Sequence, residues 1–499
     1  MDSIFSVILS NVGWDVQSLL LFAAVFILTT DYIKNRQPAS FPPRPWGFPI
    51  VGNLFSVDHN KTHESMTELA GKFGDVYSLR MGKIWIVVVS SFKVFKEALV
   101  TYGHNTADRP PLPMSNELNH KLGIFASSGN LWKQQRRFAL STLRNFGLGK
   151  KSLEPAILQE FTYSSNDLRK FKGEPCDIRQ IINNAVSNII CSLVFGHRFE
   201  YTDKRFRKLI NYFEELLRIQ VSLWSWCYNS YPKLVRYLPG PHKRLRHMFN
   251  DVEAFIKEEL EQHKQNWDPS DQRDYIDCYL NEIQTSKGEQ DSTFEEGNLV
   301  ICVLDLFVAG TETTTATLLW GFLYMAQHPE IQAKVQAEID EVIGSKEPST
   351  MDRVGLPYTD AVIHEVMRMG NTVPLSVPHF TSNEVQLGGY TLPKGTAVIP
   401  NLTSVLYDKN EWATSSTFNP GHFLNEEGRF VKPAAFIPFS AGKRQCPGES
   451  LAKMELFLFF TSFLQNFTFS MPAGVKPVMD TKFSIVLSPL PYNICATPR

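Results

Sequence analysis

Phe439-Ser440-Ala441-Gly442-Lys443-Arg444-Gln445-Cys446-Pro447-Gly448-Glu449 is the stretch from which the fold of this 499-residue chain can be predicted. One cysteine follows a basic, glycine-containing loop and precedes a segment whose apolar residues recur with helical spacing. Pro447 suits a first helical turn, where its missing N–H costs nothing. Helix N-terminal amides and a cationic loop favour a thiolate, and a lone thiolate suits one axial position of a haem iron. Alternatively, Cys446 is a small buried apolar residue, as free cysteines often are. The spacing alone favours neither the iron ligand nor the buried residue.

The amino-terminal residues 1–33 predict a membrane anchor. The stretch from Ser3 to Ile33 exceeds the roughly 20 helical residues that cross a bilayer. A cleaved signal peptide is the alternative, but the amino end lacks a basic region and no clear small-residue cleavage site follows. Lys34 and Arg36 come after the apolar run, so we expect the remainder of the chain on the cytosolic side of the membrane.

A proline-rich segment follows the anchor. Phe41–Pro49 contains prolines that lack backbone donors and push their neighbours toward extended conformations, which predicts a stiff hinge over residues 34–50. Length alone suggests about three domains, but residues 51–499 contain no linker and are expected to form one domain. Helical patterns dominate it, so we expect a mainly α fold with a small β-sheet region (α+β), whose strands are predicted at Val76–Met81, Ile84–Val89, Val385–Leu387 and Ala397–Ile399.

Charge and cysteine usage exclude some classes of protein. The formal net charge is −1, so no overall positive field points to nucleic acid. The cysteines lack Cys-x-x-Cys spacing, which argues against a disulfide framework or a zinc site and for a reducing compartment. Seven are present: Cys176, Cys191, Cys227, Cys278, Cys302, Cys446 and Cys495.

A long helix is predicted from a capping box at Thr293–Glu296 to about Gln327, where Pro329 stops it. Its midpoint, Ala309-Gly310-Thr311-Glu312-Thr313-Thr314, consists of poor helix formers whose hydroxyls can bond back to carbonyls. A helix that breaks local rules at its centre often does so for function. A packing notch between helices is the alternative.

Two helical pairs of residues also stand out. Trp132 and Arg136 are four residues apart and share one helix face, within a basic run whose default reading is a solvated charged surface. Glu365 and Arg368 are three apart, a common pair worth only a few tenths of a kcal/mol when isolated on a helix surface.

The cysteine stretch resembles the haem-binding signature Phe-x-x-Gly-x-Arg-x-Cys-x-Gly of cytochromes P-450, which Phe439, Gly442, Arg444, Cys446 and Gly448 match position for position. The resemblance covers nearly the whole chain and implies the cytochrome P-450 fold with haem b (iron protoporphyrin IX) as cofactor. Cys446 would then be the iron ligand.

The same resemblance implies roles for residues elsewhere. Residues 309–314 resemble the family's oxygen-activation motif, so Thr313 would hold water near the oxygen that haem binds and Glu312 would feed protons inward. Trp132 and Arg136 resemble a haem-propionate contact. The remaining cofactor-binding candidates implied by the alignment are Arg109, Ala309, His379, Phe439 and Arg444.

Glu365 and Arg368 match the family's Glu-x-x-Arg, a structural network behind the cysteine loop. Its third member lies in a Pro-x-Arg-Phe segment, which here reads Pro420-Gly421-His422-Phe423. Histidine replaces arginine, so His422 is expected to donate from a ring nitrogen in a weaker, pH-sensitive link.

Further stretches, among them Arg144–Lys151 and Leu238–His242, look like vertebrate microsomal family 2 and most like its subfamily 2 J, which oxidises polyunsaturated fatty acids and some drugs. This implies a monooxygenase in the endoplasmic reticulum membrane. Its partners would be O₂, a lipophilic substrate such as arachidonate or a xenobiotic, NADPH-cytochrome P-450 reductase, and cytochrome b5 as a further candidate. The substrate pocket implied by analogy includes Leu112, Ile124, Ala309, Val373, Val377 and Val486.

Two other functions remain open at this stage. A haem-thiolate peroxide isomerase works without reductase, and a non-enzymatic haem- or sterol-binding membrane protein performs no chemistry. Neither needs the acid–alcohol pair, which is intact here as Glu312 and Thr313. The pair therefore favours the monooxygenase.

Overall fold

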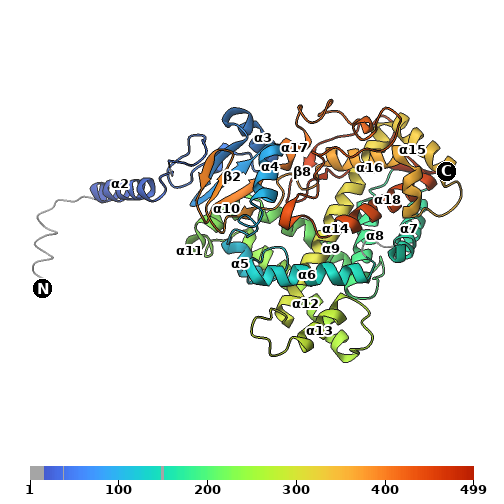
Figure 1. Cartoon of the computed structure of the whole chain (residues 1–499), viewed down its shortest axis with the longest axis horizontal. Helices are drawn as coiled ribbons and strands as arrows, with labels where there is room; N and C mark the ends of the chain where they lie inside the picture. The colour runs from blue at the N-terminus through green and yellow to red at the C-terminus, as the bar shows by residue number, and fades with distance from the viewer. Residues whose placement is uncertain (1–15, 38, 148–150) are drawn as a thin grey trace, which may run out of the picture.

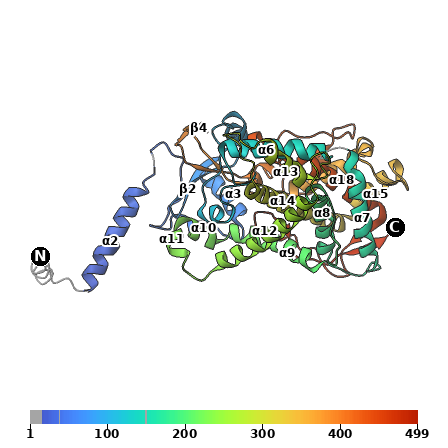
Figure 2. The same cartoon turned by 90° about the horizontal axis from the view of Figure 1, so that it is seen from below.

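The computed structural model describes residues 16–37, 39–147 and 151–499. The first half of the predicted anchor and residues 148–150 of the Arg144–Lys151 stretch lie outside this range. Helix α2 (Val16–Lys34) projects from one end of a mainly helical body, and the carboxyl terminus lies at the opposite end (Figures 1 and 2). The largest sheet lies at the end of the body from which α2 projects (Figure 1).

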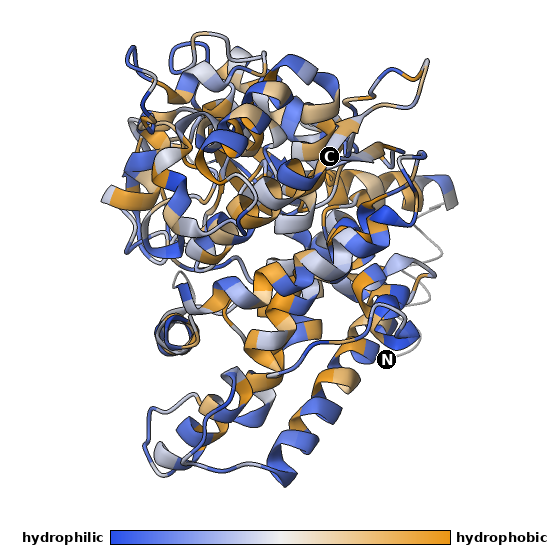
Figure 3. Ribbon diagram, turned by 90° about the vertical axis from the view of Figure 1, so that its right-hand side faces the viewer, coloured by the Kyte–Doolittle hydropathy of each residue, from blue (hydrophilic) through white to orange (hydrophobic). Residues whose placement is uncertain are grey.

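Helices make up most of the body, and their apolar and polar residues alternate along the ribbon as expected for amphipathic elements (Figure 3). They are α3 Thr62–Phe73, α4 Phe92–Lys96, α5 Pro113–Asn119, α6 Gly129–Asn145, α7 Glu154–Arg169, α8 Arg179–Val194, α9 Lys204–Gln220, α10 Leu223–Ser230, α11 Pro232–Val235, α12 Pro241–Gln265, α13 Tyr275–Thr285, α14 Glu296–Gln327, α15 Pro329–Val342, α16 Pro357–Gly370, α17 Leu402–Leu406 and α18 Glu449–Asn466.

Four strands form the main sheet in the order β1-β2-β6-β3. The predicted hairpin is confirmed at its predicted bounds, because β1 and β2 pair antiparallel with Val76 opposite Val89. Strand β6 runs parallel to β2, and the short β3 is antiparallel to β6. The strands are β1 Val76–Met81, β2 Ile84–Val89, β3 His379–Phe380, β4 Val385–Leu387, β5 Tyr390–Leu392, β6 Ala397–Pro400, β7 Phe467–Ser470, β8 Thr481–Lys482, β9 Ser488–Pro489 and β10 Cys495–Pro498.

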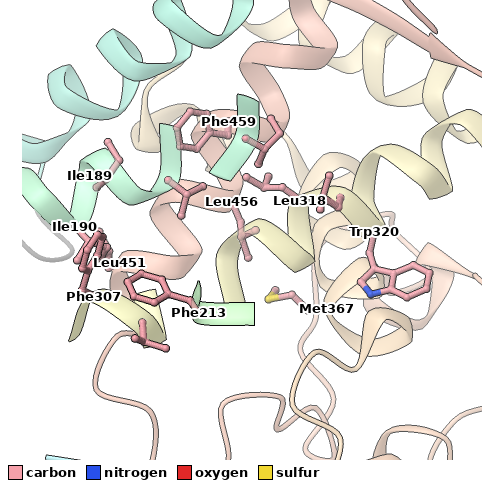
Figure 4. Packing of buried hydrophobic residues seen from close by; sticks show 14 of the residues in the cluster. Ile189, Ile190, Phe213, Phe307, Leu318, Trp320, Met367, Leu451, Leu456 and Phe459 are labelled. Carbon is pink, nitrogen blue, oxygen red and sulfur yellow. The ribbon is translucent and has the colours of Figure 1, made fainter. Parts of the chain in front are cut away.

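Helix α14 runs through the core and packs against α8, α12, α16 and α18. Both α2 and α14 are long and apolar enough to cross a bilayer, but α14 is mostly buried inside the body whereas α2 is not. The neighbouring helices pack against α14 through interdigitated apolar side chains (Figure 4). The labelled residues are Ile189, Ile190, Phe213, Phe307, Leu318, Trp320, Met367, Leu451, Leu456 and Phe459.

Two predicted helix starts are wrong. Helix α14 begins at Glu296 and has no capping box, because the Thr293 hydroxyl and amide both donate to the Gln134 side chain on α6. Pro447 lies in a turn ahead of α18, which begins at Glu449 with Gly448 as its N-cap. The start of α14 is determined by contacts with α6. The start of α18 is determined by the turn that carries the cysteine.

Candidate functional site

The cysteine loop is shaped by one glycine. Gly442 opens a short 3-10 turn (Gly442–Arg444) with φ of +75°, and a Cβ at this position would lie 1.8 Å from the carbonyl oxygen of Leu99. Only glycine tolerates both the left-handed backbone and this approach. The amide of Cys446 then donates to the Phe439 carbonyl at 3.0 Å, which closes the loop. These contacts fix the direction in which the cysteine side chain leaves the backbone.

Cys446 as a whole residue is exposed, whereas its sulfur lies among enough protein groups to be partly desolvated. Burial raises the pKa of this thiol above its ordinary value, while the Gly448 amide, which donates to the sulfur, and the Arg136 guanidinium lower it. In the protein without a bound metal, the effect of burial therefore outweighs the groups that favour a thiolate. A metal bound at the sulfur would restore the thiolate.

The set of donor atoms suits haem. Within the described ranges, the one grouping of three metal-ligating side chains (His263, Asp274 and Asp277) does not include Cys446. A sulfur without neighbouring protein ligands does not fit a tetrahedral zinc site, whereas it fits a macrocycle that brings its own four nitrogens.

Several cationic side chains converge near the cysteine loop. The Arg444 guanidinium lies 3.9 Å from the centroid of the Trp132 ring and donates to the carbonyl of Ala107 at 2.6 Å. Arg136, on the same helix as Trp132, donates to the carbonyl of Gln445. Arg109 donates to the carbonyls of Val377 and Pro378 at 3.2 and 2.8 Å. Residues from α6, the cysteine loop and the segment before β3 therefore meet at one place.

This cluster carries uncompensated positive charge. Burial and repulsion from neighbouring guanidinium groups lower the pKa of Arg109 to about 9 and that of Arg444 to about 8, and burial lowers the pKa of His379 to about 3. Among the described residues, none of Arg109, Arg136 and Arg444 has a carboxylate within 4.0 Å. Buried cations require counter-charges, and two carboxylates such as the haem propionates would supply them.

Trp132 offers a second indication. Its indole N–H is buried and has no hydrogen-bond partner in the described part of the chain. Buried donors are almost always satisfied in folded proteins. An acceptor that the chain does not contain, such as a propionate oxygen, fits this position.

The middle of α14 presents an accessible face in an otherwise buried helix. Ala309 is exposed and Gly310, Glu312 and Thr313 are partly exposed, whereas most positions on either side are buried. The Thr313 hydroxyl donates to the Ala309 carbonyl at 2.7 Å, as expected for a hydroxyl in a helix. Glu312 keeps one carboxyl oxygen buried and unpartnered. Burial and the nearby Glu214 raise its pKa to about 8, against the opposing effect of two cations.

Asp305 links this face to the cysteine loop, a role that the sequence did not indicate. Its carboxylate accepts the amides of Ile124 and Phe125 at 2.7 and 2.9 Å. The Ile124 carbonyl in turn accepts from Arg444 at 3.2 Å. Burial raises the pKa of Asp305 to about 7, and the two amides oppose that shift. Since Ala309 lies one helical turn beyond Asp305, the segment around Ile124 joins the accessible face of α14 to the cysteine loop.

Glu365 and Arg368 form a fully buried ion pair with two contacts of 2.7 Å. The arginine also donates to the carbonyls of Leu406 and Ser415 at 2.8 Å. His422 lies against Glu365 through its Nδ1 at 3.2 Å, as the resemblance implied.

Two hydrogen bonds fix the state of His422. The backbone N–H of Thr414 donates to its Nε2 at 3.2 Å, so Nε2 must accept and Nδ1 must carry the proton that faces Glu365. A ring that carries its proton on Nδ1 satisfies the link to Glu365. The pH sensitivity expected from the sequence remains a prediction.

The predicted pocket residues lie on four loops and on α14. The Leu487 amide donates to the Thr372 carbonyl at 2.7 Å, which joins the segments that carry Val486 and Val373. Arg109 ties the segment of Val377 to that of Phe125 through bonds to both carbonyls. Arg109 and Leu112 lie in one loop ahead of α5, so the same bonds join the segment of Leu112 to these two segments. The six predicted residues are Leu112, Ile124, Ala309, Val373, Val377 and Val486.

Known proteins resemble this chain over nearly its full length. The family model for cytochrome P450 matches residues 42–496. Cytochrome P450 2J1 of Oryctolagus cuniculus is 48% identical over 98% of this chain and 97% of its own length. Cytochrome P450 2J2 of Homo sapiens is 46% identical over 97% and 96%, and cytochrome P450 2D6 of Homo sapiens is 43% identical over 96% and 98%. This chain therefore belongs to the cytochrome P450 family, as a haem-binding, 2J-like monooxygenase of family 2.

Proposed function

We propose that this monooxygenase hydroxylates or epoxidises lipophilic substrates, polyunsaturated fatty acids such as arachidonate and xenobiotics among them. Electrons come from NADPH through NADPH-cytochrome P-450 reductase, with cytochrome b5 as a second donor. The protein is held in the endoplasmic reticulum membrane by α2, with its body in the cytosol. The likeness to 2J proteins and the apolar, largely exposed α2 support this proposal.

The observation that carries the proposal is the acid–alcohol pair on the accessible face of α14. The pKa of Glu312 is raised to about 8, so its carboxyl group is mostly protonated at neutral pH. Thr313 is the next residue, and its hydroxyl donates its hydrogen to Ala309 while its oxygen stays free to accept one. A protonated acid beside an accepting hydroxyl can hold a water and pass a proton through it.

Haem, when bound, supplies the activation of oxygen at its iron. The sulfur of Cys446 would be its protein ligand, with the Gly448 amide directed at that sulfur. Trp132, Arg109, Arg136 and Arg444 would hold its propionates through the unpartnered indole N–H and the guanidinium groups. The carbonyl bonds of the arginines orient these side chains before the cofactor arrives, so its binding orders few additional groups.

A basic surface beside the cysteine loop suits an acidic electron donor. Arg136 joins α6 to this loop, and exposed Lys133 and Arg137 lie on the same helix, near exposed Lys443. Lys453, also a candidate, is paired with Glu449 at 2.6 Å. Opposite charges steer the encounter of a donor with such a surface and fix its register.

The test is product formation by the purified full-length protein with reductase, NADPH and a panel of unsaturated fatty acids and drugs. Hydroxylated or epoxidised products should appear only when reductase and NADPH are both present. Rearrangement of added peroxides without reductase would instead favour an isomerase. Haem binding without any turnover of the panel would favour a binding protein and overturn the proposal.

A further inference from the structure

The carboxyl-terminal end of α2 is attached to the body by a partly buried ion pair. Arg80 on strand β1 directs its Nη1 at both carboxylate oxygens of Asp31, at 3.1 and 3.0 Å. The side chains of Arg80 and Asp31 are only 6% and 13% exposed. Most ion pairs on this chain are far more exposed than that, and exposed pairs contribute little. An acidic residue at the end of an apolar helix thus has a specific partner.

The same aspartate holds a strained turn. Ile50 adopts φ of +67°, a left-handed conformation that β-branched residues strongly disfavour. Its N–H donates to Asp31 at 3.0 Å, and its carbonyl accepts from the Tyr231 hydroxyl at 2.8 Å. A backbone conformation of this kind persists only where its surroundings impose it. Here the contacts come from α2 on one side and from the start of α11 on the other.

Arg80 also holds the aromatic segment before that turn. Its Nη2 donates to the Phe48 carbonyl at 2.9 Å. Trp46, Phe48 and Phe55 form a chain of edge-to-face contacts, with ring centroids 4.6 and 6.5 Å apart, and are 72%, 47% and 68% exposed. Aromatic side chains of this exposure beside an apolar helix suit the interface between lipid headgroups and acyl chains.

We propose that Asp31 is a latch that fixes the angle between the membrane anchor and the body. Through Arg80 and Ile50, it holds the aromatic chain Trp46–Phe48–Phe55 against the headgroup layer of the bilayer that α2 enters. The anchor and the body then move as one unit at the membrane instead of being joined by a free tether. This inference rests on the membrane anchoring proposed above.

The test uses the full-length holoprotein in phospholipid vesicles and compares Asp31→Asn and Asp31→Ala with the wild type. Asp31 is not part of the apolar core, so both changes act on its polar contacts with Arg80 and Ile50. The matched control is Glu64→Gln. Glu64 lies on α3 and forms an exposed ion pair with Lys61, which this change removes. Retention of each variant on the vesicles after an alkaline wash tests the anchoring by itself.

Both Asp31 variants should stay anchored, with tryptic cleavage after Lys34 and Arg36 about tenfold faster than in the wild type and with faster amide exchange over residues 46–55. In oriented bilayers, linear dichroism of the haem should show a broader range of tilt. Glu64→Gln should match the wild type in all three measurements. Unchanged cleavage, exchange and tilt in the anchored Asp31 variants would overturn the latch. Loss of the wild type from the vesicles in the wash would instead refute the anchoring, and the latch would fall with it.

Discussion

At the scale of single residues, the chemistry of the site depends on groups that lack partners. Trp132 has an unsatisfied N–H, and the arginines near it have no carboxylates among the described residues. On α14, Glu312 has an unsatisfied carboxyl oxygen. Buried polar groups are almost always satisfied in folded proteins, so these exceptions need an explanation. They point to a cofactor and a proton path.

Replacing Cys446 with serine should remove the protein ligand of the iron. The reduced protein with CO should lose the red-shifted Soret band that reports thiolate ligation, because a hydroxyl is a poor substitute for the sulfur. Cys278→Ser, a change at a partly buried cysteine on α13, should leave the band in place. A red-shifted band in the Cys446 variant would refute the ligand assignment.

Thr313→Ala should keep haem but divert electrons from substrate to peroxide, since the hydroxyl that would hold water is gone. We expect the peroxide formed per NADPH consumed to rise by a factor of several. Thr315→Ala is the matched control, because that hydroxyl lies on the same helix but is buried. Equal coupling in the two variants would mean that the Thr313 hydroxyl serves only the helix.

Glu455 on α18 should make stability fall as pH rises. It is fully buried, and neither carboxyl oxygen has a full hydrogen bond, although the Thr314 hydroxyl is close enough to lower its pKa. Burial dominates and raises that pKa from 4.5 to about 8. The folded state therefore binds more protons than the unfolded state between these pH values, and stability is lost across this window as pH rises.

The corresponding change is Glu455→Gln, which cannot ionise. The variant and the wild type should unfold at similar temperatures at pH 5, and the variant should be the more stable by about 1–3 kcal/mol at pH 8. Thermal midpoints followed by circular dichroism at both pH values measure this. A difference that does not grow with pH would show that the acid is already solvated in the folded protein.

At the scale of elements, structure that depends on one short stretch could be predicted from the sequence. Structure that depends on contacts between distant elements could not. The β1–β2 hairpin was predictable because alternation and the Gly82 turn are local signals. The start of α14 was not, since Gln134 on α6 takes the groups of Thr293 that would have capped it. A cap read from four residues cannot include a competitor that lies 159 residues away.

The same limit applies to the site. Motif resemblance identified Cys446, Thr313 and the Glu365–Arg368 pair, because each lies in a short recognisable stretch. The linking role of Asp305 was not predicted, because its partner Phe125 lies 180 residues earlier in a loop without a pattern. The one available signal was an acid on the apolar stripe of a buried helix, where a charge must have partners. The tautomer of His422 likewise depends on a backbone amide that no motif includes.

Helix α6 supports a prediction of its own, because it carries both Trp132 and Arg136. Trp132→Phe keeps an aromatic ring under Arg444 but removes the unpartnered N–H. A hydrogen bond to a charged acceptor is worth about 1.5–3 kcal/mol, so haem should dissociate about 10–100 times faster. Transfer of haem to an apomyoglobin acceptor measures the rate. Trp267→Phe, which also removes a buried unpartnered indole N–H but lies outside the cluster, is the control.

At the scale of the whole molecule, membrane orientation follows from a few charges at one end of the chain. Lys34 ends α2 and Arg36 follows it, and both are expected to remain on the cytosolic side. The hinge predicted over residues 34–50 remains a prediction, although Pro42 and Pro43 accept hydrogen bonds from Ser78 on β1. The proposed cytosolic orientation keeps the whole body away from the glycosylation machinery.

Asn60 makes that orientation testable. The sequence contains three acceptor motifs, at Asn60, Asn401 and Asn466, of which Asn401 is fully buried in the folded protein. Asn60 is exposed, so its modification reports topology. We expect no mass shift on glycosidase treatment of the protein from cells. A shift that Asn60→Gln abolishes would place the body in the lumen.

The bonds of Arg444 have a consequence for biosynthesis. This side chain donates to carbonyls that lie 337, 320 and 317 residues earlier, at Ala107, Ile124 and Ser127. Contacts that close such large loops form late, because the chain entropy must be lost before they are gained. On the ribosome the amino-terminal two thirds emerge long before Arg444 and Cys446 do. With the anchoring proposed above, the nascent chain is already inserted through α2 when its last tenth is made. Only then can it take up haem, so the cofactor is needed only at the end of synthesis.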